Sequence, residues 1–143
     1  MNGYLIDNDI FFASIYEGHT QHKASRKWLD DVKPSGWAIS TETFLAAMRL
    51  LMNPAVMGPN PLNGEQAWDV VSMEIGGKHP ANKLYATHLP DRELFAPATG
   101  HKQIMDLWLV QLSREHGYKL ATRDHALVRN NPDYCFLLKN YVS

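Results

Sequence analysis

A short apolar run that ends in a carboxylate lies almost at the N-terminus and limits the folds open to this chain. Residues 4–6 read as a strand, and Asp7 follows them directly. A strand that opens a chain in this way is usually central and buried, and open α/β sheets bind their ligands at the carboxyl ends of such strands. We therefore expect Asp7 either to hold a cation or to cap the turn into the next helix.

Predicted strands alternate with predicted helices along the rest of the chain. Strands are expected at 4–6, 37–39, 118–121 and 135–138, and the main helices at 10–15, 19–32, 40–52, 63–75 and 104–116. Three prolines interrupt residues 79–99, where we expect a short helix at 81–87 and a short strand at 93–96. This alternation predicts one α/β domain over residues 1–143, with a parallel sheet of four or five strands between two helical layers.

Composition and charge exclude several classes of protein. The hydrophobic content of 45% suffices for a core, and the net charge of -1 gives no overall basic field of the kind found on DNA-coating proteins. A single cysteine, Cys135, rules out an internal disulfide framework and a cysteine-cluster zinc site, and it fits a reducing cytoplasm. No apolar run approaches the roughly 18–20 residues of a membrane span, and no signal peptide is evident. A cytoplasmic protein without a membrane anchor is expected.

Three further acids stand where they could join Asp7. Asp106 lies in the apolar helix 104–116, which we expect to be buried, and a lone carboxylate there is costly unless it is paired, protonated or bound to a metal. Asp124 follows a strand as Asp7 does, and Glu42 lies in the first helical turn after the strand 37–39. The alternatives are an ion pair or a solvent-facing helix end for Asp106, an N-cap for Asp124 and a surface role for Glu42.

Considered together, the acids favour a metal site. The carboxyl ends of parallel strands lie along one edge of a sheet, and oxygen ligands without His or Cys select Mg²⁺ or Mn²⁺. Such a cluster can activate water and neutralise the charge of a phosphodiester. The histidines compete poorly, because His19 and His22 lie one turn apart without an evident third ligand. Motifs typical of serine hydrolases or nucleotide-binding loops are absent from the sequence.

The same segments resemble a PIN domain, specifically a VapC-type toxin ribonuclease, over nearly the whole chain. The matching stretches are 5–11, 19–29, 49–56, 100–106 and 117–124, the last of which ends in Thr122-Arg123-Asp124. Two features depart from the family pattern. The family usually has Asn where this chain has Asp9, and Glu42 lies further from Arg49 than expected.

The resemblance implies a PIN-like three-layer α/β/α fold and a metal-dependent endoribonuclease of the toxin–antitoxin kind. It implies transfer or ribosomal RNA as targets, a cognate antitoxin that covers the site, and a homodimer. Mg²⁺ or Mn²⁺ would be held by the four acids, with Asn8 and Thr122 as hydrogen-bonding supports. Candidates for contact with RNA phosphates are Arg123, Lys102 and Arg49.

Two other functions remain open at this point. A haloacid-dehalogenase-like phosphatase would use Asp7 as nucleophile and Asp9 as general acid, although that pattern favours a small or branched residue where Phe11 stands. It would also need a late acidic pair, which the sequence does not supply. Alternatively, the domain is a non-catalytic PIN module that binds RNA or a partner protein.

Overall fold

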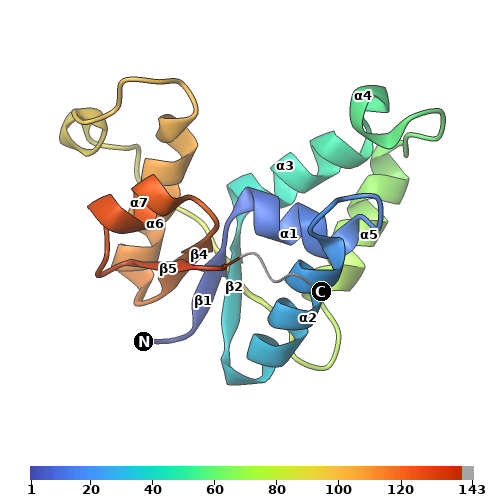
Figure 1. Ribbon diagram of the computed structural model, residues 1–143, viewed down its shortest axis with the longest axis horizontal. Helices are drawn as coiled ribbons and strands as arrows, with labels where there is room; N and C mark the ends of the chain where they lie inside the picture. Colours follow the sequence, from blue (N-terminus) through green and yellow to red (C-terminus); the bar gives the residue numbers. More distant parts are fainter. Residues whose placement is uncertain (140–143) are drawn as a thin grey trace.

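The computed structural model describes residues 1–139, which form a three-layer α/β/α fold (Figure 1). Within these residues the sheet has five strands in the order β3-β2-β1-β4-β5, and every neighbouring pair is parallel. The prediction of a central parallel sheet of four or five strands is confirmed, and the opening strand is its middle one. The strands are β1 (Tyr4–Ile6), β2 (Trp37–Ser40), β3 (Asn82–Leu84), β4 (Lys119–Thr122) and β5 (Cys135–Leu137).

Alternation along the strands divides the core into two layers. Successive strand residues face opposite sides of a sheet, so Leu5 joins the cluster that contains Trp108 and Leu109, whereas Ile6 joins the cluster of Phe11 and Trp28. Figure 1 shows the helices that follow from this division, with one group to the right of the sheet and α6 and α7 to its left. The first group is α1 (Asn8–Ile15), α2 (His22–Val32), α3 (Thr41–Leu51) and α5 (Gly64–Ile75); the second is α6 (Gln103–His116) and α7 (His125–Asn130).

Capping residues set the ends of these helices at positions that the sequence indicates. Ser40 is the N-cap of α3, and its hydroxyl accepts a hydrogen bond from the Thr43 N–H. Asn63 and Gln66 form a reciprocal capping box at the start of α5, as predicted. Gly117 ends α6 with a φ of 75°, a left-handed conformation that glycine adopts without strain.

Residues 79–99 were predicted wrongly in both elements. The segment expected to be a helix contains β3, whose Asn82 pairs with Ala38 at the open edge of β2 and donates a side-chain hydrogen bond to the Tyr118 hydroxyl at 2.7 Å. The segment expected to be a strand contains a 3₁₀ helix, Arg92–Phe95, closed by a backbone bond from Leu94 N–H to the Asp91 carbonyl. Both segments are too short to carry a period, so tertiary contacts decide their conformation.

One helix boundary and one loop also differ from expectation. The helix predicted from residue 19 begins at His22, because the His19 ring accepts the Gln21 N–H at 2.9 Å and stabilises a turn instead. The predicted loop after α3 contains a four-residue helix, α4 (Pro54–Met57), with Asn53 as its cap. No helix in the part of the chain that the structure describes is long and apolar enough to cross a membrane.

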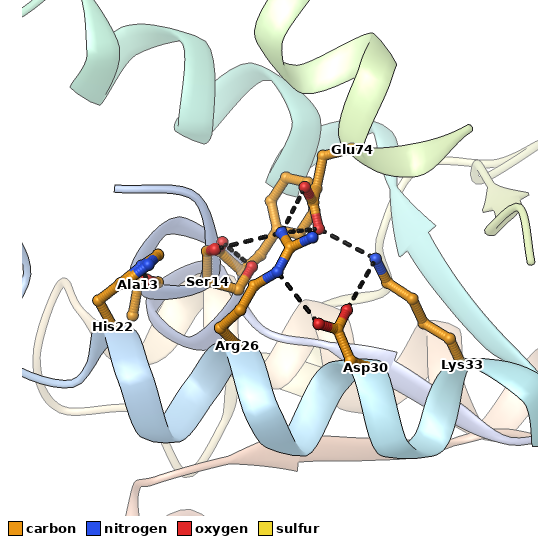
Figure 2. A network of polar contacts seen from close by, with 8 residues as sticks. Ala13, Ser14, His22, Arg26, Asp30, Lys33 and Glu74 are labelled. Atoms are coloured by element: carbon orange, nitrogen blue, oxygen red, sulfur yellow. Dashed lines mark hydrogen bonds and ion pairs between the residues drawn. The ribbon is translucent and has the colours of Figure 1, made fainter. Parts of the chain in front are cut away.

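A charged network joins α2 to the end of α5 (Figure 2). The Glu74 carboxylate, 13% exposed, accepts bonds from Arg26 at 2.6 Å and from Lys33 at 3.0 Å. Arg26 also contacts Asp30 one turn along its own helix at 3.3 Å. Because Glu74 meets two cations in a partly buried place, this network fixes the outer helical layer more firmly than exposed ion pairs would.

Candidate functional site

Asp7 lies directly after the central strand and performs two tasks at once. Its side chain is 8% exposed, and Oδ1 accepts the Ile10 N–H at 2.9 Å as the N-cap of α1. Burial raises its pKa to about 6; the hydrogen bonds from Ile10 and the Thr122 side chain oppose that rise, and the charges of Asp9 and Asp106 add to it. Asp7 can therefore cap the helix and also hold a cation, because the cap occupies only one carboxylate oxygen.

Asp106 and Asp124 are the next two acids of the candidate site. Both line a cavity of about 220 Å³ between α6 and α7. Burial raises the pKa of Asp106, and the charge of Asp124 raises it further. Asp124 is the N-cap of α7, and its Oδ1 accepts the Leu127 N–H at 3.1 Å. The fold thus brings together the two helix starts at which the sequence placed Asp106 and Asp124.

The buried thiol of Cys135 lies within reach of the charges of these three acids. Cys135 lies on β5, next to β4 in the sheet. Its pKa is raised to about 11, first by burial and then by the negative charges of Asp106, Asp7 and Asp124. Asp7 and Asp124 directly follow the neighbouring strands β1 and β4, so both lie at the carboxyl edge of the sheet.

The expected burial of the helix around Asp106 needs correction. Asp106 lies in the first turn of α6, and its neighbours Ile104 and Met105 are 45% and 37% exposed. An apolar stretch at a helix end need not be covered, because the sheet shields only the part of the helix that lies over it. Asp106 is half-buried, and no salt bridge to it is present among residues 1–139.

Glu42 is held in a manner that its position in the sequence does not reveal. It lies in the first turn of α3, and its Oε1 accepts the indole N–H of Trp108 at 3.1 Å. Its Oε2 is buried and has no hydrogen-bond partner within the described part of the chain. Glu42 is therefore not a surface residue that only complements the helix dipole. The contact of Trp108 with Glu42 was not predicted from the sequence. The one available signal was that Trp108 lies two residues after Asp106.

Two hydrogen-bonding residues connect the segments that carry the acids. The Thr122 hydroxyl accepts the Asp124 N–H at 3.1 Å, and Thr122 lies close enough to Asp7 to lower its pKa. Asn8 Oδ1 accepts the Thr43 hydroxyl at 2.5 Å, and that hydroxyl accepts the Ser40 hydroxyl at 3.1 Å. The Asn8–Thr43 contact joins the starts of α1 and α3, and a backbone bond from the Asp7 N–H to the Ala121 carbonyl at 3.2 Å joins the ends of β1 and β4. Sequence reasoning did not find Ser40 or Thr43 in this role.

The three cations proposed to meet RNA have different surroundings. Arg123 bonds to Asp9 at 2.7 Å and to the Ser25 hydroxyl, and its side chain is only 14% exposed. Lys102 is exposed at the start of α6, and Arg49 is exposed in the last turn of α3 beside a cavity of about 520 Å³. Arg123 therefore serves the fold, and Lys102 and Arg49 are the cations free to meet a ligand.

This arrangement also assigns a place to Asp9, the residue that departs from the family pattern. Its carboxylate contacts Arg123 at 2.7 Å and His19 at 3.1 Å. A general acid of a phosphatase has to face the leaving group, whereas this carboxylate is occupied by two basic partners. The geometry gives no support to the phosphatase alternative.

Replacing Arg123 by glutamine is expected to lower the free energy of unfolding by about 1–2 kcal/mol. The buried Ser25 hydroxyl would lose its partner, and the turn between β4 and α7 would lose its tie to α1. Urea unfolding measures the change, with Arg129→Gln as a control because Arg129 is exposed on α7. Equal effects of the two substitutions would contradict a structural role for Arg123.

The donors suit a hard divalent cation, although they do not form a closed cage. Within residues 1–139, no three His, Cys, Asp or Glu side chains stand close enough together to surround one ion in this conformation. Mg²⁺ is usually bound through one or two carboxylates, with water and substrate phosphates completing its octahedron. The buried, unpartnered oxygen of Glu42 and the raised pKa of Asp7 both mark groups that a nearby cation would stabilise.

Comparison with solved structures supports the fold. The chain is similar to a domain of a functionally unknown protein from Methanocaldococcus jannaschii, with a TM-score of 0.53 and 15% sequence identity. The match covers 100% of this chain and 95% of the other. At this identity the likeness concerns the fold alone.

Comparison with curated proteins identifies the family, although no family model matches the chain. Ribonuclease VapC41 of Mycobacterium tuberculosis is 30% identical over 136 residues, which cover 87% of this chain and 91% of that protein. Ribonuclease VapC29 of the same organism is 28% identical over 140 residues, with 94% and 95% covered. Ribonuclease VapC39 is 24% identical over 127 residues, with 86% and 89% covered. Together with the PIN-like fold, these relatives show that the chain belongs to the VapC family of PIN-domain toxins.

Proposed function

We propose that this chain is a single-domain, Mg²⁺- or Mn²⁺-dependent endoribonuclease and the toxin of a toxin–antitoxin pair. One observation carries the proposal: Asp106 and Asp124 line the same cavity, and Asp7 lies close enough to Asp106 for the charge of Asp106 to raise the pKa of Asp7. Like charges held together in a partly buried place are costly unless a cation neutralises them. RNA is proposed as the substrate because the relatives that match most of the chain are named as ribonucleases.

In this proposal Asp7, Glu42, Asp106 and Asp124 hold the metal. Asp7 and Asp124 each have one oxygen fixed by a backbone N–H at 2.9 and 3.1 Å, so their second oxygens are oriented without further loss of side-chain freedom. When bound, Mg²⁺ or Mn²⁺ would activate the attacking water and neutralise charge on the phosphodiester. Thr122 supports this arrangement by accepting the Asp124 N–H, which orients the backbone that carries the Asp124 carboxylate.

Lys102 and Arg49 are the proposed contacts to RNA phosphates. Both are exposed, and Arg49 shares its cavity with Asn8, the residue that follows Asp7. Phosphate contacts of this kind fix the position of RNA without selecting a sequence. We therefore propose that they present transfer or ribosomal RNA to the acids.

A cognate antitoxin and a second copy of the chain are the proposed protein partners. Exposed apolar side chains on α3 and α5 support an interaction surface, because Leu45 is 54% and Trp68 53% exposed. They border a cavity of about 260 Å³ that also contains Phe44. Contiguous exposed apolar surface of this kind marks sites of protein association.

Removing divalent ions with EDTA is expected to abolish RNA cleavage by the purified chain, and adding Mg²⁺ or Mn²⁺ back should restore it. The reason is that the acids alone place negative charge against a negatively charged substrate. End mapping of transfer and ribosomal RNA measures the cleavage, and co-purified antitoxin should block it. Undiminished cleavage in excess EDTA would contradict the metal dependence. RNA binding without cleavage, in either ion, would favour the non-catalytic alternative.

A further inference from the structure

One core indole makes a direct hydrogen bond to an acid of the proposed metal site. Trp108 lies on α6, and its Nε1–H donates to Oε1 of Glu42 on α3 at 3.1 Å. The other carboxylate oxygen, Oε2, is buried and has no partner in the stretch from residue 1 to 139. The contact thus joins helices from opposite sides of the sheet. It leaves one oxygen of Glu42 hydrogen-bonded and the other without a partner among the described residues.

The indole is held so that its N–H has one direction. Its side chain is 9% exposed and belongs to the core cluster that contains Leu84 and Leu109. The His88 ring meets it edge-on at a centroid distance of 6.1 Å, and His88 is itself bound to Glu115 at 2.9 Å. A ring packed on several sides cannot rotate to another acceptor, so it fixes Glu42 rather than following it.

An indole is a suitable group for this task because it donates one hydrogen bond and carries no charge. A lysine or arginine in its place would neutralise Glu42 and compete with a metal ion. A buried carboxylate oxygen without a partner is costly, and a cation bound there removes that cost. The two oxygens of Glu42 are thereby given separate tasks.

We propose that Trp108 is a positioning residue of the carboxylate site: its indole N–H holds Oε1 of Glu42 and leaves Oε2 as the oxygen that meets the metal ion. This inference rests on the proposed function, because it presumes that Glu42 is a ligand. It adds a residue that contacts neither metal nor RNA. Hydrogen-bond donors that orient ligands in this way commonly set metal affinity.

Trp108→Phe tests the inference, since phenylalanine keeps most of the buried ring and removes the N–H. We expect the dissociation constant for Mn²⁺, measured by titration calorimetry without RNA, to rise about tenfold. The kcat for RNA cleavage should fall while KM for RNA stays unchanged. Trp37→Phe is the matched control, because Trp37 is 1% exposed and its N–H donates to the His79 carbonyl at 2.7 Å, not to an acid. That control should bind Mn²⁺ like wild type.

A double-mutant cycle separates this role from general stabilisation. In a Glu42→Gln background, Trp108→Phe is expected to weaken Mn²⁺ binding no further, because both substitutions act through the same carboxylate. Equal weakening in both backgrounds would overturn the inference. If wild type binds Mn²⁺ no better than Trp108→Phe, the inference about Trp108 is wrong but the proposed function stands. If wild type neither binds Mn²⁺ nor cleaves RNA, the proposed function is wrong as well.

A measurement on the wild-type protein covers the case in which Trp108→Phe does not fold. The chain has four tryptophans, so ¹⁵N labelling gives four indole signals, and phenylalanine variants of Trp28, Trp37 and Trp68 identify the fourth by elimination. The Trp108 signal is expected to shift during a Mg²⁺ titration, whereas the Trp37 signal stays in place. A Trp108 signal that does not move while calorimetry shows the ion bound would refute the inference.

Discussion

An Asp7→Asn variant is expected to be more stable than wild type in the absence of divalent ions, by up to about 3 kcal/mol at pH 7. Burial, with smaller contributions from the charges of Asp9 and Asp106, raises the pKa of Asp7 from 3.8 to about 6 in the folded protein. Ionised Asp7 is therefore less favourable in the fold than in the unfolded chain. Asparagine removes the charge and keeps an acceptor oxygen for the Ile10 N–H, so the helix cap survives.

The pH dependence of this difference has a definite sign. Because the folded pKa of about 6 lies above the unfolded value of 3.8, the folded protein binds more protons between these values. Wild type should lose more stability than the variant as pH rises through this window. Urea unfolding in EDTA between pH 4 and pH 8, at roughly unit steps, measures both curves. They should meet near the acid end and be fully separated at neutral pH.

Asp69→Asn is the control for this comparison, because Asp69 is an exposed aspartate of α5. Addition of Mg²⁺ or Mn²⁺ should remove most of this difference in stability. A ligand that binds only the folded state at a hundred times its dissociation constant stabilises it by about 2.7 kcal/mol, and the variant would gain less. A variant that is less stable than wild type at pH 7 in EDTA would contradict the account of Asp7.

Sequence was sufficient to predict the layers and the general place of the acids. The apolar run 4–6 and the patterns at 118–121 and 135–138 marked three neighbouring parallel strands. Asp7 and Asp124 were found because an acid that directly follows a strand lies at a known edge of an open sheet. Capping was only an alternative to metal binding for these two residues, yet both are N-caps in the structure, since a residue at a strand end also starts the next helix.

The contacts between distant segments could not be predicted in the same way. Nothing in the local pattern indicates that Trp108 would reach Glu42, because their separation of 66 positions is closed only by packing of α6 on the sheet. The partnership of Asp9 with Arg123 spans 114 positions and has no local signature either. Asp106 was assigned to a buried helix because apolar composition does not tell which end of a helix the sheet covers. Side-chain partners of this kind depend on the assembled tertiary structure.

Loss of a single acid is expected to lower RNA cleavage far more than any other substitution considered. Asp7→Asn and Asp106→Asn should each reduce the single-turnover rate in Mg²⁺ by at least about a hundredfold. Each substitution removes one negative charge from the group of acids. In that group the charge of Asp106 raises the pKa of Asp7, and the charge of Asp124 raises the pKa of Asp106. Asp69→Asn should cleave at the wild-type rate, and circular dichroism checks that all variants are folded.

The single-turnover cleavage rate of Asp7→Asn, compared with wild type in saturating Mg²⁺ on the same RNA, tests the central claim most directly. The account predicts a folded variant that still binds RNA and cleaves it at about one hundredth of the wild-type rate or less. A folded Asp7→Asn protein that cleaves at the wild-type rate would show that the acids at this edge of the sheet are not the catalytic centre.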